Sequence, residues 1–296
     1  MCAREVFLQG LVSMRVKALQ GVGAEVSEID LGRLSDSERV EIRAAFAEYG
    51  LLFFRDQDID EQGHLCFSRM WGKINVNRFF GAHPDYPEIA VVAKEPEQTG
   101  NIGGSWHTDH SYDHHPALGS ILVAKQLPPS GGDTWFTSMY KAYEGLSTGL
   151  QAFLGGLRAV HSAKHVFGTQ QPERVAEAVV KRFHNQAAAD ALDDPIHPVV
   201  IKHGLSDRKA LYVNRAFTRR FEGWTEAESA PLLDVLYAAA IREEYITRFR
   251  WQPGSVVFWD NRATWHFAQN DYQGHRRVMH RTTIVGGPLQ GSGLVS

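Results

Sequence analysis

Cysteine is scarce in this sequence, whose 296 residues contain only Cys2 and Cys66. Because two cysteines, one of them next to the first residue, cannot build a disulfide framework, the chain does not fit the disulfide-rich secreted proteins. They also exclude a zinc site made of several cysteines within one chain. The low cysteine content is typical of a reducing compartment, and we predict a cytoplasmic location.

Long apolar runs are also missing, since no stretch approaches the roughly 18 consecutive apolar residues that indicate a membrane-spanning helix. Residues Met1–Leu19 carry polar side chains throughout, and they lack the apolar core and small-residue cleavage site of a signal peptide. We therefore expect no association with a membrane. Residues 1–13 are expected to be a disordered leader or the product of an upstream start site.

An excess of basic residues is absent as well, because 31 Lys and Arg residues stand against 34 Asp and Glu, giving a net charge of −3. Proteins that bind nucleic acid or anionic lipid usually present a basic surface. We therefore exclude nucleic acid as a partner. The partners that we expect are a small organic acid, for reasons given below, and further copies of the chain in a homo-oligomer.

The composition that is present, 43% hydrophobic and 22% charged, is that of an ordinary globular protein with a sizeable core. No internal repeat, low-complexity tract or long linker divides the chain, so residues 14–296 are predicted to form a single domain.

Helix signals are clear in the first quarter of the chain. Ser35 has the character of an N-cap, Glu38 completes a capping box, and Gly50 marks the end of the helix. Leu51–Phe54 is a short apolar run of the buried-strand type, and a second helix is predicted over 60–71. A buried strand between two helices indicates a layered fold.

Short β-prone runs separated by Gly and Pro dominate the rest of the sequence. Strands are predicted at 88–93, 103–109, 118–126, 132–137, 157–163, 197–202, 209–214, 245–251, 255–260, 264–268 and 278–285. Helices are predicted over 138–154 and after Thr225, which forms a second capping box with Glu228. The polar stretch 165–195 has little strand pattern and is interpreted as a cover over the active site. The expected fold class is mainly β with flanking helices: a double-stranded β-helix, or jelly roll, with a helical or loop insertion over its mouth.

The run Gly103–His110 contains His107 and Asp109, two residues apart. If this run is extended, both side chains leave on one face, and His266, at the end of an aromatic strand-like segment, is the candidate for a third ligand. Two histidines and one carboxylate form the facial triad that suits non-haem Fe(II) and leaves positions open for a cosubstrate and O2. A His-x-Asp pair alone is a weak signal, and a second one occurs at His83–Asp85 in a proline-bracketed turn.

Two arginines follow the third candidate ligand. Arg277 and Arg281 are four residues apart, so on a strand they share a face. An arginine deep in the mouth of a β-fold needs an anion, because leaving its charge buried and unpaired costs on the order of several kcal/mol. A dicarboxylate cosubstrate would supply that anion, and the hydroxyl of Thr134 can donate to the same carboxylate.

Taken together, four stretches closely resemble the taurine dioxygenase family, which includes the aryloxyalkanoate dioxygenases and depends on Fe(II) and 2-oxoglutarate. They are Trp106–Asp109, Gly131–Thr134, Trp259–Asn261 with His266, and Asp271–Tyr272 with Arg277 and Arg281. The resemblance extends from about residue 15 to residue 287. The steps from His107 to Thr134 and from His266 to Arg277 match the spacing of the family.

The resemblance implies a role for each of these positions. His107, Asp109 and His266 would bind the iron, and Thr134 and Arg277 would hold the far carboxylate of 2-oxoglutarate. Arg281 would bind either that carboxylate or the anionic group of the substrate. Because related halogenases replace the metal-binding carboxylate, the presence of Asp109 also argues against halogenation.

Four residues are expected near the substrate, namely Asn77, Phe80, His110 and Phe217, and the resemblance itself places the first two there. Asn77 and Phe80 occupy positions where taurine dioxygenase uses a histidine and a tyrosine, and Gly103 replaces an asparagine. These differences remove polar partners for taurine and leave room for a larger apolar group. Aryloxyalkanoates, alkyl sulfates or longer sulfonates are therefore the expected substrates.

Other interpretations stay open from the residues alone. His266 could be a packed core histidine, Thr134 an ordinary strand residue, and Arg281 a surface charge or the partner of an acidic neighbour. The same iron site could catalyse desaturation or ring formation instead of a hydroxylation that gives succinate and CO2. A jelly-roll protein that binds a metal without turnover is a third hypothesis, although it would have no need of Arg277 and Thr134.

Overall fold

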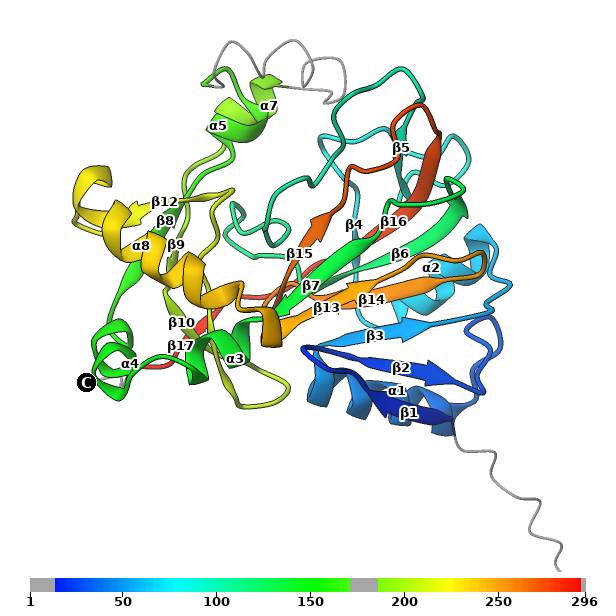
Figure 1. The fold of residues 1–296 in the computed structure, drawn as a ribbon, viewed down its shortest axis with the longest axis horizontal. Coiled ribbons are helices and arrows are strands. Elements are labelled where there is room, and N and C mark those ends of the chain that lie inside the picture. Colours follow the sequence, from blue (N-terminus) through cyan, green and yellow to red (C-terminus); the bar gives the residue numbers. More distant parts are fainter. Residues whose placement is uncertain (1–13, 171–185, 294–296) are drawn as a thin grey trace, which may run out of the picture.

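The computed structural model describes residues 14–170 and 186–293, and its largest element is an eight-stranded sheet (Figure 1). The sheet has the order β1-β2-β3-β14-β6-β16-β4, and β5 also pairs with β16. All neighbours are antiparallel except β2 and β3. The strands are β1 (Arg15–Ala18), β2 (Ala24–Ser27), β3 (Leu51–Phe54), β4 (Ile74–Asn75), β5 (Ala90–Lys94), β6 (Gly119–Gln126), β14 (Val256–Asp260) and β16 (Arg277–Ile284).

A three-stranded sheet packs on one face of the large sheet. It has the order β13-β7-β15 and consists of β7 (Thr134–Ser138), β13 (Ile246–Phe249) and β15 (Thr264–Ala268). Phe136 of β7 and Phe249 of β13 lie in one buried cluster with Phe53, Trp259 and Met279 of the large sheet. Burial of these apolar side chains between the two sheets is the main contribution that holds them together.

Two helices cover the opposite face of the large sheet, α1 (Asp36–Tyr49) and α2 (Glu61–Arg69) (Figure 1). Phe46 of α1 stacks on Phe258 of β14 with ring centroids 3.8 Å apart. All four residues of β3 are buried, which confirms the prediction of a buried strand there. The large sheet is thus enclosed by helices on one face and by the small sheet on the other.

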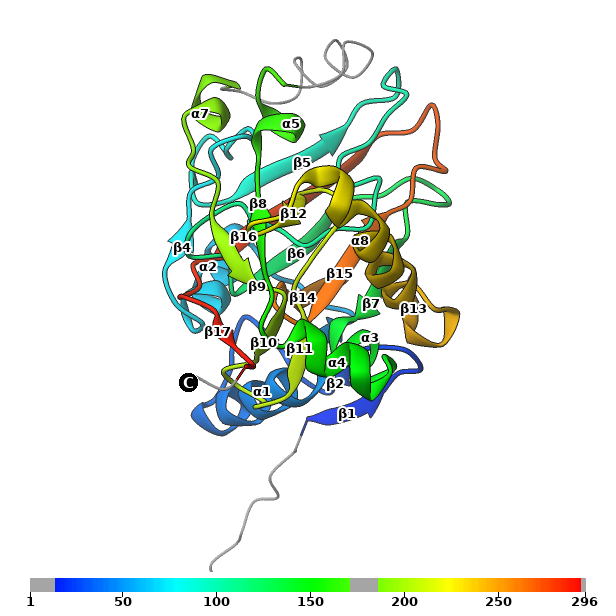
Figure 2. The ribbon, with the colours of Figure 1, turned by 90° about the vertical axis from the view of Figure 1, so that its left-hand side faces the viewer.

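Two further three-stranded sheets lie with α8 (Glu226–Ala240) on the side of the molecule that faces the viewer in Figure 2. One consists of β8 (Arg158–His161), β9 (Ile196–Pro198) and β12 (Thr218–Phe221), and the other of β10 (Val200–Lys202), β11 (Lys209–Leu211) and β17 (Gln290–Gly291). The remaining described helices are α3 (Met139–Glu144), α4 (Thr148–Leu154), α5 (Lys164–Phe167), α7 (Gln186–Asp190) and the 3-10 helix η1 (Glu243–Tyr245). In the described part of the chain, no helix combines the length and apolar character needed to cross a membrane.

The predicted ends of α1 and the predicted start of α8 are confirmed. Ser35 Oγ accepts a hydrogen bond from the backbone of Glu38, whose carboxylate accepts one from the backbone of Ser35. Gly50 ends α1 with a φ of 66°, a left-handed conformation that a side chain would strain. Thr225 and Glu228 form the same capping box at α8.

Two predicted elements are wrong. Residues 103–109 are not a strand, because the backbone is left-handed at Gly103 (φ 78°) and bends at Ser105 and Trp106. Only an isolated antiparallel bridge between His107 and His266 is present there. The helix predicted over 138–154 is two helices, α3 and α4, since Ser147 starts a new helix by accepting a hydrogen bond from the backbone of Leu150.

The strand predicted over 197–202 is two strands, β9 and β10, which belong to different sheets. The other predicted strands are present with small shifts at their ends, whereas β2, β4, β12 and β17 were not expected. Residues 1–13, and residues 171–185 of the predicted cover, lie outside the described residues. That residues 14–296 form one domain stays a prediction.

Candidate active site

His107 and His266 come together through the backbone. The N–H of His107 donates to the carbonyl oxygen of His266 at 3.1 Å, and the N–H of His266 donates to that of His107 at 2.8 Å. The two imidazole centroids are 4.1 Å apart. This bridge places β15, which carries His266, beside the loop that carries His107.

The carboxylate of Asp109 faces both imidazoles. Asp109 Oδ1 lies 3.9 Å from Nε2 of His107, and Asp109 Oδ2 lies 3.9 Å from Nε2 of His266. One ligand atom from each residue lies within 4.8 Å of the others. Two nitrogen donors and one oxygen donor that converge on one point fit Fe(II) and leave the opposite side open.

The charge state of each ligand suits a metal. Burial lowers the pKa of His107 and holds that of His266 well below its usual value, so both rings are neutral and keep a lone pair. Burial alone would raise the pKa of Asp109, but the charge of Arg281 holds it below its ordinary range. Asp109 is therefore an anion inside the protein.

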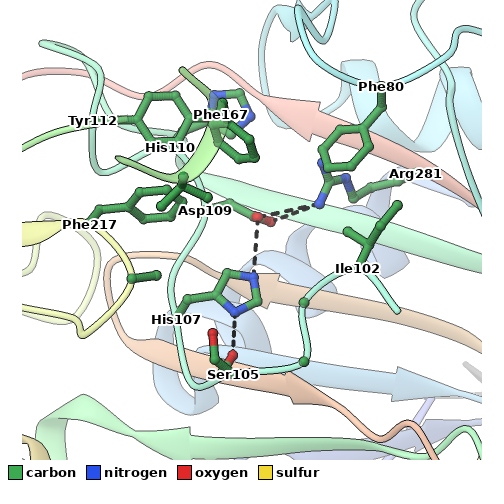
Figure 3. Close-up of a pocket in the computed structure, with 14 residues that line it drawn as sticks. Phe80, Ile102, Ser105, His107, Asp109, His110, Tyr112, Phe167, Phe217 and Arg281 are labelled. Atoms are coloured by element: carbon green, nitrogen blue, oxygen red, sulfur yellow. Dashed lines mark hydrogen bonds and ion pairs between the residues drawn. The ribbon is translucent and has the colours of Figure 1, made fainter. Parts of the chain in front are cut away.

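A hydrogen bond orients His107. Its Nδ1 lies 2.7 Å from the carbonyl oxygen of Ser105, which can only accept, so Nδ1 carries the hydrogen. The lone pair of the ring is then on Nε2, which points toward Asp109 (Figure 3). A backbone carbonyl behind a histidine is a common way to fix the tautomer of a metal ligand.

A small cavity of about 50 Å³ adjoins the triad and contains Thr134 and Arg277. Arg277 is 6% exposed, and its Nε and Nη2 have no hydrogen-bond partner among the described residues. Trp251 Nε1 donates to Thr134 Oγ1 at 2.9 Å, which leaves the hydroxyl hydrogen of Thr134 free to donate. Gly132 adopts a left-handed conformation (φ 72°) that a side chain would strain, and a Cβ would also lie only 3.2 Å from the side chain of Arg277. A buried guanidinium without an anion and a free hydroxyl fit a carboxylate of 2-oxoglutarate.

A larger cavity of about 110 Å³ shares His107 and Arg281 with the smaller one and is also lined by Asp109 (Figure 3). Its lining is mostly apolar and includes Phe80, Ile102, Tyr112, Phe167 and Phe217. A concave apolar site with a few polar groups is typical of a small-molecule site.

Arg281 lines both cavities. Its Nη1 lies 3.3 Å from Asp109 Oδ1, and its guanidinium carbon lies 4.7 Å from the ring centroid of Phe80. Figure 3 shows the guanidinium between that ring and the carboxylate. The interpretation of Arg281 as a surface charge is therefore wrong, because the residue is 6% exposed.

His110 lines the larger cavity and is 2% exposed. Its Nδ1 lies 3.0 Å from Asp113 Oδ2, and Asp113 also forms an ion pair with Arg78. No described residue hydrogen-bonds to Nε2 of His110. The ring is thus held on one side and retains a free nitrogen on the other.

Asn77 is not part of the lining of the larger cavity, unlike the other three residues expected near the substrate. Its Oδ1 accepts hydrogen bonds from the backbone N–H groups of Phe79 and Phe80 at 2.8 and 2.9 Å. The turn that Asn77 stabilises carries Phe80, so its contact with the cavity is indirect.

Sequence reasoning missed several residues of the site. Ile102, Tyr112 and Phe167 line the larger cavity, and Ser120 donates to Asp109. Tyr112 lies three residues after Asp109, so proximity to the metal motif could have indicated it. The others carry no local signal, since their positions depend on how distant elements pack.

Comparison with known proteins agrees with this geometry. The model of the family described as taurine catabolism dioxygenase TauD, TfdA family, matches residues 15–283. The chain belongs to this family. Relatives include the alpha-ketoglutarate-dependent sulfate ester dioxygenase of Pseudomonas putida, 32% identical over 90% of this chain and 87% of the relative. Another is the alpha-ketoglutarate-dependent 2,4-dichlorophenoxyacetate dioxygenase of Cupriavidus pinatubonensis, 31% identical over 88% and 94%.

A solved structure of a taurine dioxygenase from Burkholderia xenovorans has a TM-score of 0.78 and 34% identity, and the match covers 94% of this chain and 91% of that one. Members of the family use 2-oxoglutarate, which is alpha-ketoglutarate under another name. The protein is thus an enzyme of the 2-oxoglutarate-dependent dioxygenase class, with a His/Asp/His site for the iron that the family implies.

Proposed function

We propose that the protein is an Fe(II)- and 2-oxoglutarate-dependent dioxygenase that hydroxylates a small organic acid of the sulfonate, alkyl sulfate or aryloxyalkanoate type. The observation that carries this proposal is the meeting of two different cavities at His107 and Arg281. One contains Arg277, a buried guanidinium whose Nε and Nη2 lack partners in the described chain, and the other combines Arg281 with aromatic side chains. A dicarboxylate suits the first cavity, and an acid with an apolar body suits the second.

Fe(II), 2-oxoglutarate and O2, when bound, supply the oxidation that inserts a hydroxyl group, and they release succinate and CO2. The residues of the protein would hold and orient these groups. His107, Asp109 and His266 would hold the iron, while Thr134 and Arg277 would fix the far end of 2-oxoglutarate.

Substrate orientation falls to the larger cavity. Arg281 would attract the acid group, and His110 would offer a hydrogen-bonding nitrogen beside it. The rings of Phe80 and Phe217 would surround the apolar body and exclude water, which strengthens both polar contacts. Hydroxylation next to an ether or sulfate ester oxygen would yield a carbonyl group and a released fragment.

We also propose that the two packed sheets form the double-stranded β-helix expected from the sequence, and that the segment around α5 and α7 forms part of its cover. The contribution of Val166 and Phe167 of α5 to the larger cavity supports the second statement. The cytoplasmic location and the homo-oligomer stay predictions.

Desaturation or ring formation at the same iron site is the alternative outcome, and it would use the same residues. A protein that binds metal without turnover is less consistent with a buried Arg277 whose Nε and Nη2 have no hydrogen-bond partner among the described residues. Oxidation of 2-oxoglutarate and identification of the product therefore test different parts of the proposal.

The test is an assay of succinate formed from 2-oxoglutarate by the Fe(II)-loaded protein, with and without each candidate acid. We expect succinate to increase only when an acid of the proposed class is added, and mass spectrometry should find a hydroxylated or cleaved product. Succinate that never responds to any sulfonate, sulfate ester or aryloxyalkanoate would contradict the proposed substrate class. A product that has lost two hydrogens would favour the desaturation alternative.

A further inference from the structure

Asp109 lies in a loop and not in a strand, so its position must be fixed by contacts outside the regular sheets. The backbone N–H of Asp109 donates to Asn261 Oδ1 at 3.3 Å, and the hydroxyl of Thr108 donates to the backbone carbonyl oxygen of Asn261. Asn261 follows β14 directly, at the start of the turn that leads to β15. One residue of this turn thus holds the loop that carries a proposed metal ligand.

A second set of hydrogen bonds reaches the carboxylate itself. Ser120 Oγ donates to Asp109 Oδ2 at 3.0 Å, and Asn261 Nδ2 donates to Ser120 Oγ at 3.2 Å. Trp259 Nε1 donates to Asn261 Oδ1 at 2.8 Å. Ser120 and Asn261 are 0% and 1% exposed, so water does not compete for these groups.

The direction of each hydrogen bond follows from chemistry. An indole nitrogen can only donate, so the atom of Asn261 that faces Trp259 is the oxygen, and the amide nitrogen faces Ser120. Because Ser120 Oγ accepts from that nitrogen, its own hydrogen is available for Asp109. The carboxylate of Asp109 can only accept. The hydrogen bonds from Asn261 to Ser120 and from Ser120 to Asp109 therefore run in one direction.

These hydrogen bonds restrict a rotation that is otherwise easy. A carboxylate turns readily about its last bond, because the torsional preference of that bond is broad. Arg281 does not fix that rotation, since its Nη1 lies 3.3 and 3.4 Å from the two oxygens of Asp109. Without a second donor, the carboxylate could turn toward Arg281 and form a closer ion pair. The hydroxyl of Ser120 holds Oδ2 on the other side.

We infer that Ser120 and Asn261 are positioning residues, which hold the Asp109 carboxylate in the orientation required for metal binding. This inference rests on the proposed function, because it assumes that Asp109 is a ligand of the iron. Groups that hydrogen-bond to metal ligands typically contribute about 10- to 100-fold to metal affinity. Loss of the Ser120 hydroxyl should therefore weaken the metal by a factor in this range.

The experiment is an anaerobic titration of the metal-free protein with Co(II). Calorimetry measures the affinity, and the visible absorption of the bound ion reports its coordination. We expect Ser120→Ala to raise the Kd for Co(II) about 10- to 100-fold and to change the absorption spectrum. Ser120→Thr, which keeps the hydroxyl, should restore most of the affinity. Where Ser120→Ala does not fold, Ser120→Cys keeps the volume and supplies only a weak donor for the same comparison.

The matched control is Ser229→Ala. Ser229 is also 0% exposed and donates to the carbonyl oxygen of Thr225, but it lies on α8 and takes no part in the site. This variant should lose stability and keep the Co(II) affinity of the wild type. A folded Ser120→Ala variant with the affinity and spectrum of the wild type would overturn the positioning role. A His107→Ala variant that keeps the Co(II) affinity of the wild type would instead show that the proposed metal site is wrong.

Discussion

Nη1 of Arg281 lies 3.3 Å from Oδ1 of Asp109, although 172 residues separate the two in the sequence. The guanidinium therefore already has one anion, the carboxylate that we propose as a metal ligand. The Nε of Arg281 has no partner in the described part of the chain, so the side chain can accept a second anion without losing the first. Because Arg281 lines both cavities, that second anion could belong to either cosubstrate or substrate.

Replacement of Arg281 by Gln distinguishes these two roles. We expect the KM for the organic acid to rise at least about 10-fold, because a charge-assisted hydrogen bond contributes roughly 1.5–3 kcal/mol. The KM for 2-oxoglutarate should change much less. Steady-state kinetics with each compound varied in turn gives both values, and the opposite pattern would assign Arg281 to 2-oxoglutarate.

Arg277 should be specific for 2-oxoglutarate. Its replacement by Ala is expected to weaken 2-oxoglutarate by about 2–5 kcal/mol, because the carboxylate would lose a buried charged partner. Arg277→Lys should restore only part of this, since a single ammonium cannot form the two parallel hydrogen bonds of a guanidinium. Anaerobic calorimetry with the metal-loaded protein measures the affinity. Arg276→Ala is the control, because Arg276 is an exposed neighbour that forms an ion pair with Glu95.

Replacement of any one of the three proposed iron ligands should have the same effect. Each of His107→Ala, Asp109→Ala and His266→Ala is expected to abolish substrate-dependent succinate formation and to lower the Fe(II) content of the protein. Far-ultraviolet circular dichroism should stay close to that of the wild type, because the three side chains border cavities. His115→Ala changes an exposed histidine near the same motif and should retain activity. Near wild-type turnover in any one of the three variants would remove that residue from the triad.

The triad and the arginines could be predicted because each lies in a short motif with a fixed spacing. His107 and Asp109 are two residues apart, and Arg277 follows His266 by 11 residues. These distances along the chain are visible without a structure. The same is true of the capping boxes at Ser35 and Thr225, which depend on residues three positions apart.

What could not be predicted depends on contacts between distant segments. The run 103–109 was expected to be a strand because its side chains suit one, but the left-handed backbone at Gly103 and the bends that follow it make it a loop. That loop is held by Asn261 and Ser120, and neither residue has a local pattern that indicates this role. Asn77 was expected beside the substrate, yet its side chain stabilises a turn, a detail that depends on side-chain rotation.

A buried histidine makes the stability of the fold sensitive to acid. His64 is 1% exposed and lies 3.1 Å from the hydroxyl of Thr282, and burial lowers its pKa to about 3. An unfolded histidine has a pKa of about 6.5. Below that pH His64 is protonated in the unfolded chain but stays neutral in the folded protein. The free energy of unfolding therefore falls as the pH decreases from about 6.5 toward 3.

The contribution of His64 between pH 7 and pH 5 should be about 2 kcal/mol of unfolding free energy. Urea unfolding at the two pH values measures the loss in the wild type. The variant His64→Gln should be less stable at pH 7 and should lose about 2 kcal/mol less between the two values. An equal loss in both proteins would show that His64 does not remain neutral in the fold.

The shape of the larger cavity predicts which acids are good substrates. Taurine is a compact zwitterion, and its ammonium group would face Phe80, Ile102 and Phe217 with few polar partners. Burying a charged group without such partners is unfavourable. An aryloxyacetate or a medium-chain alkyl sulfate can place its anionic group near Arg281 and its apolar body against the rings. We therefore expect kcat/KM for taurine to be at least about 10-fold below that of the better of these two acids, because each well-filled apolar contact adds roughly 1–3 kcal/mol.

Phe217→Ala should lower kcat/KM for the larger acids and leave that for taurine nearly unchanged. A kcat/KM for taurine far above the other two would mean that the apolar lining does not select the substrate.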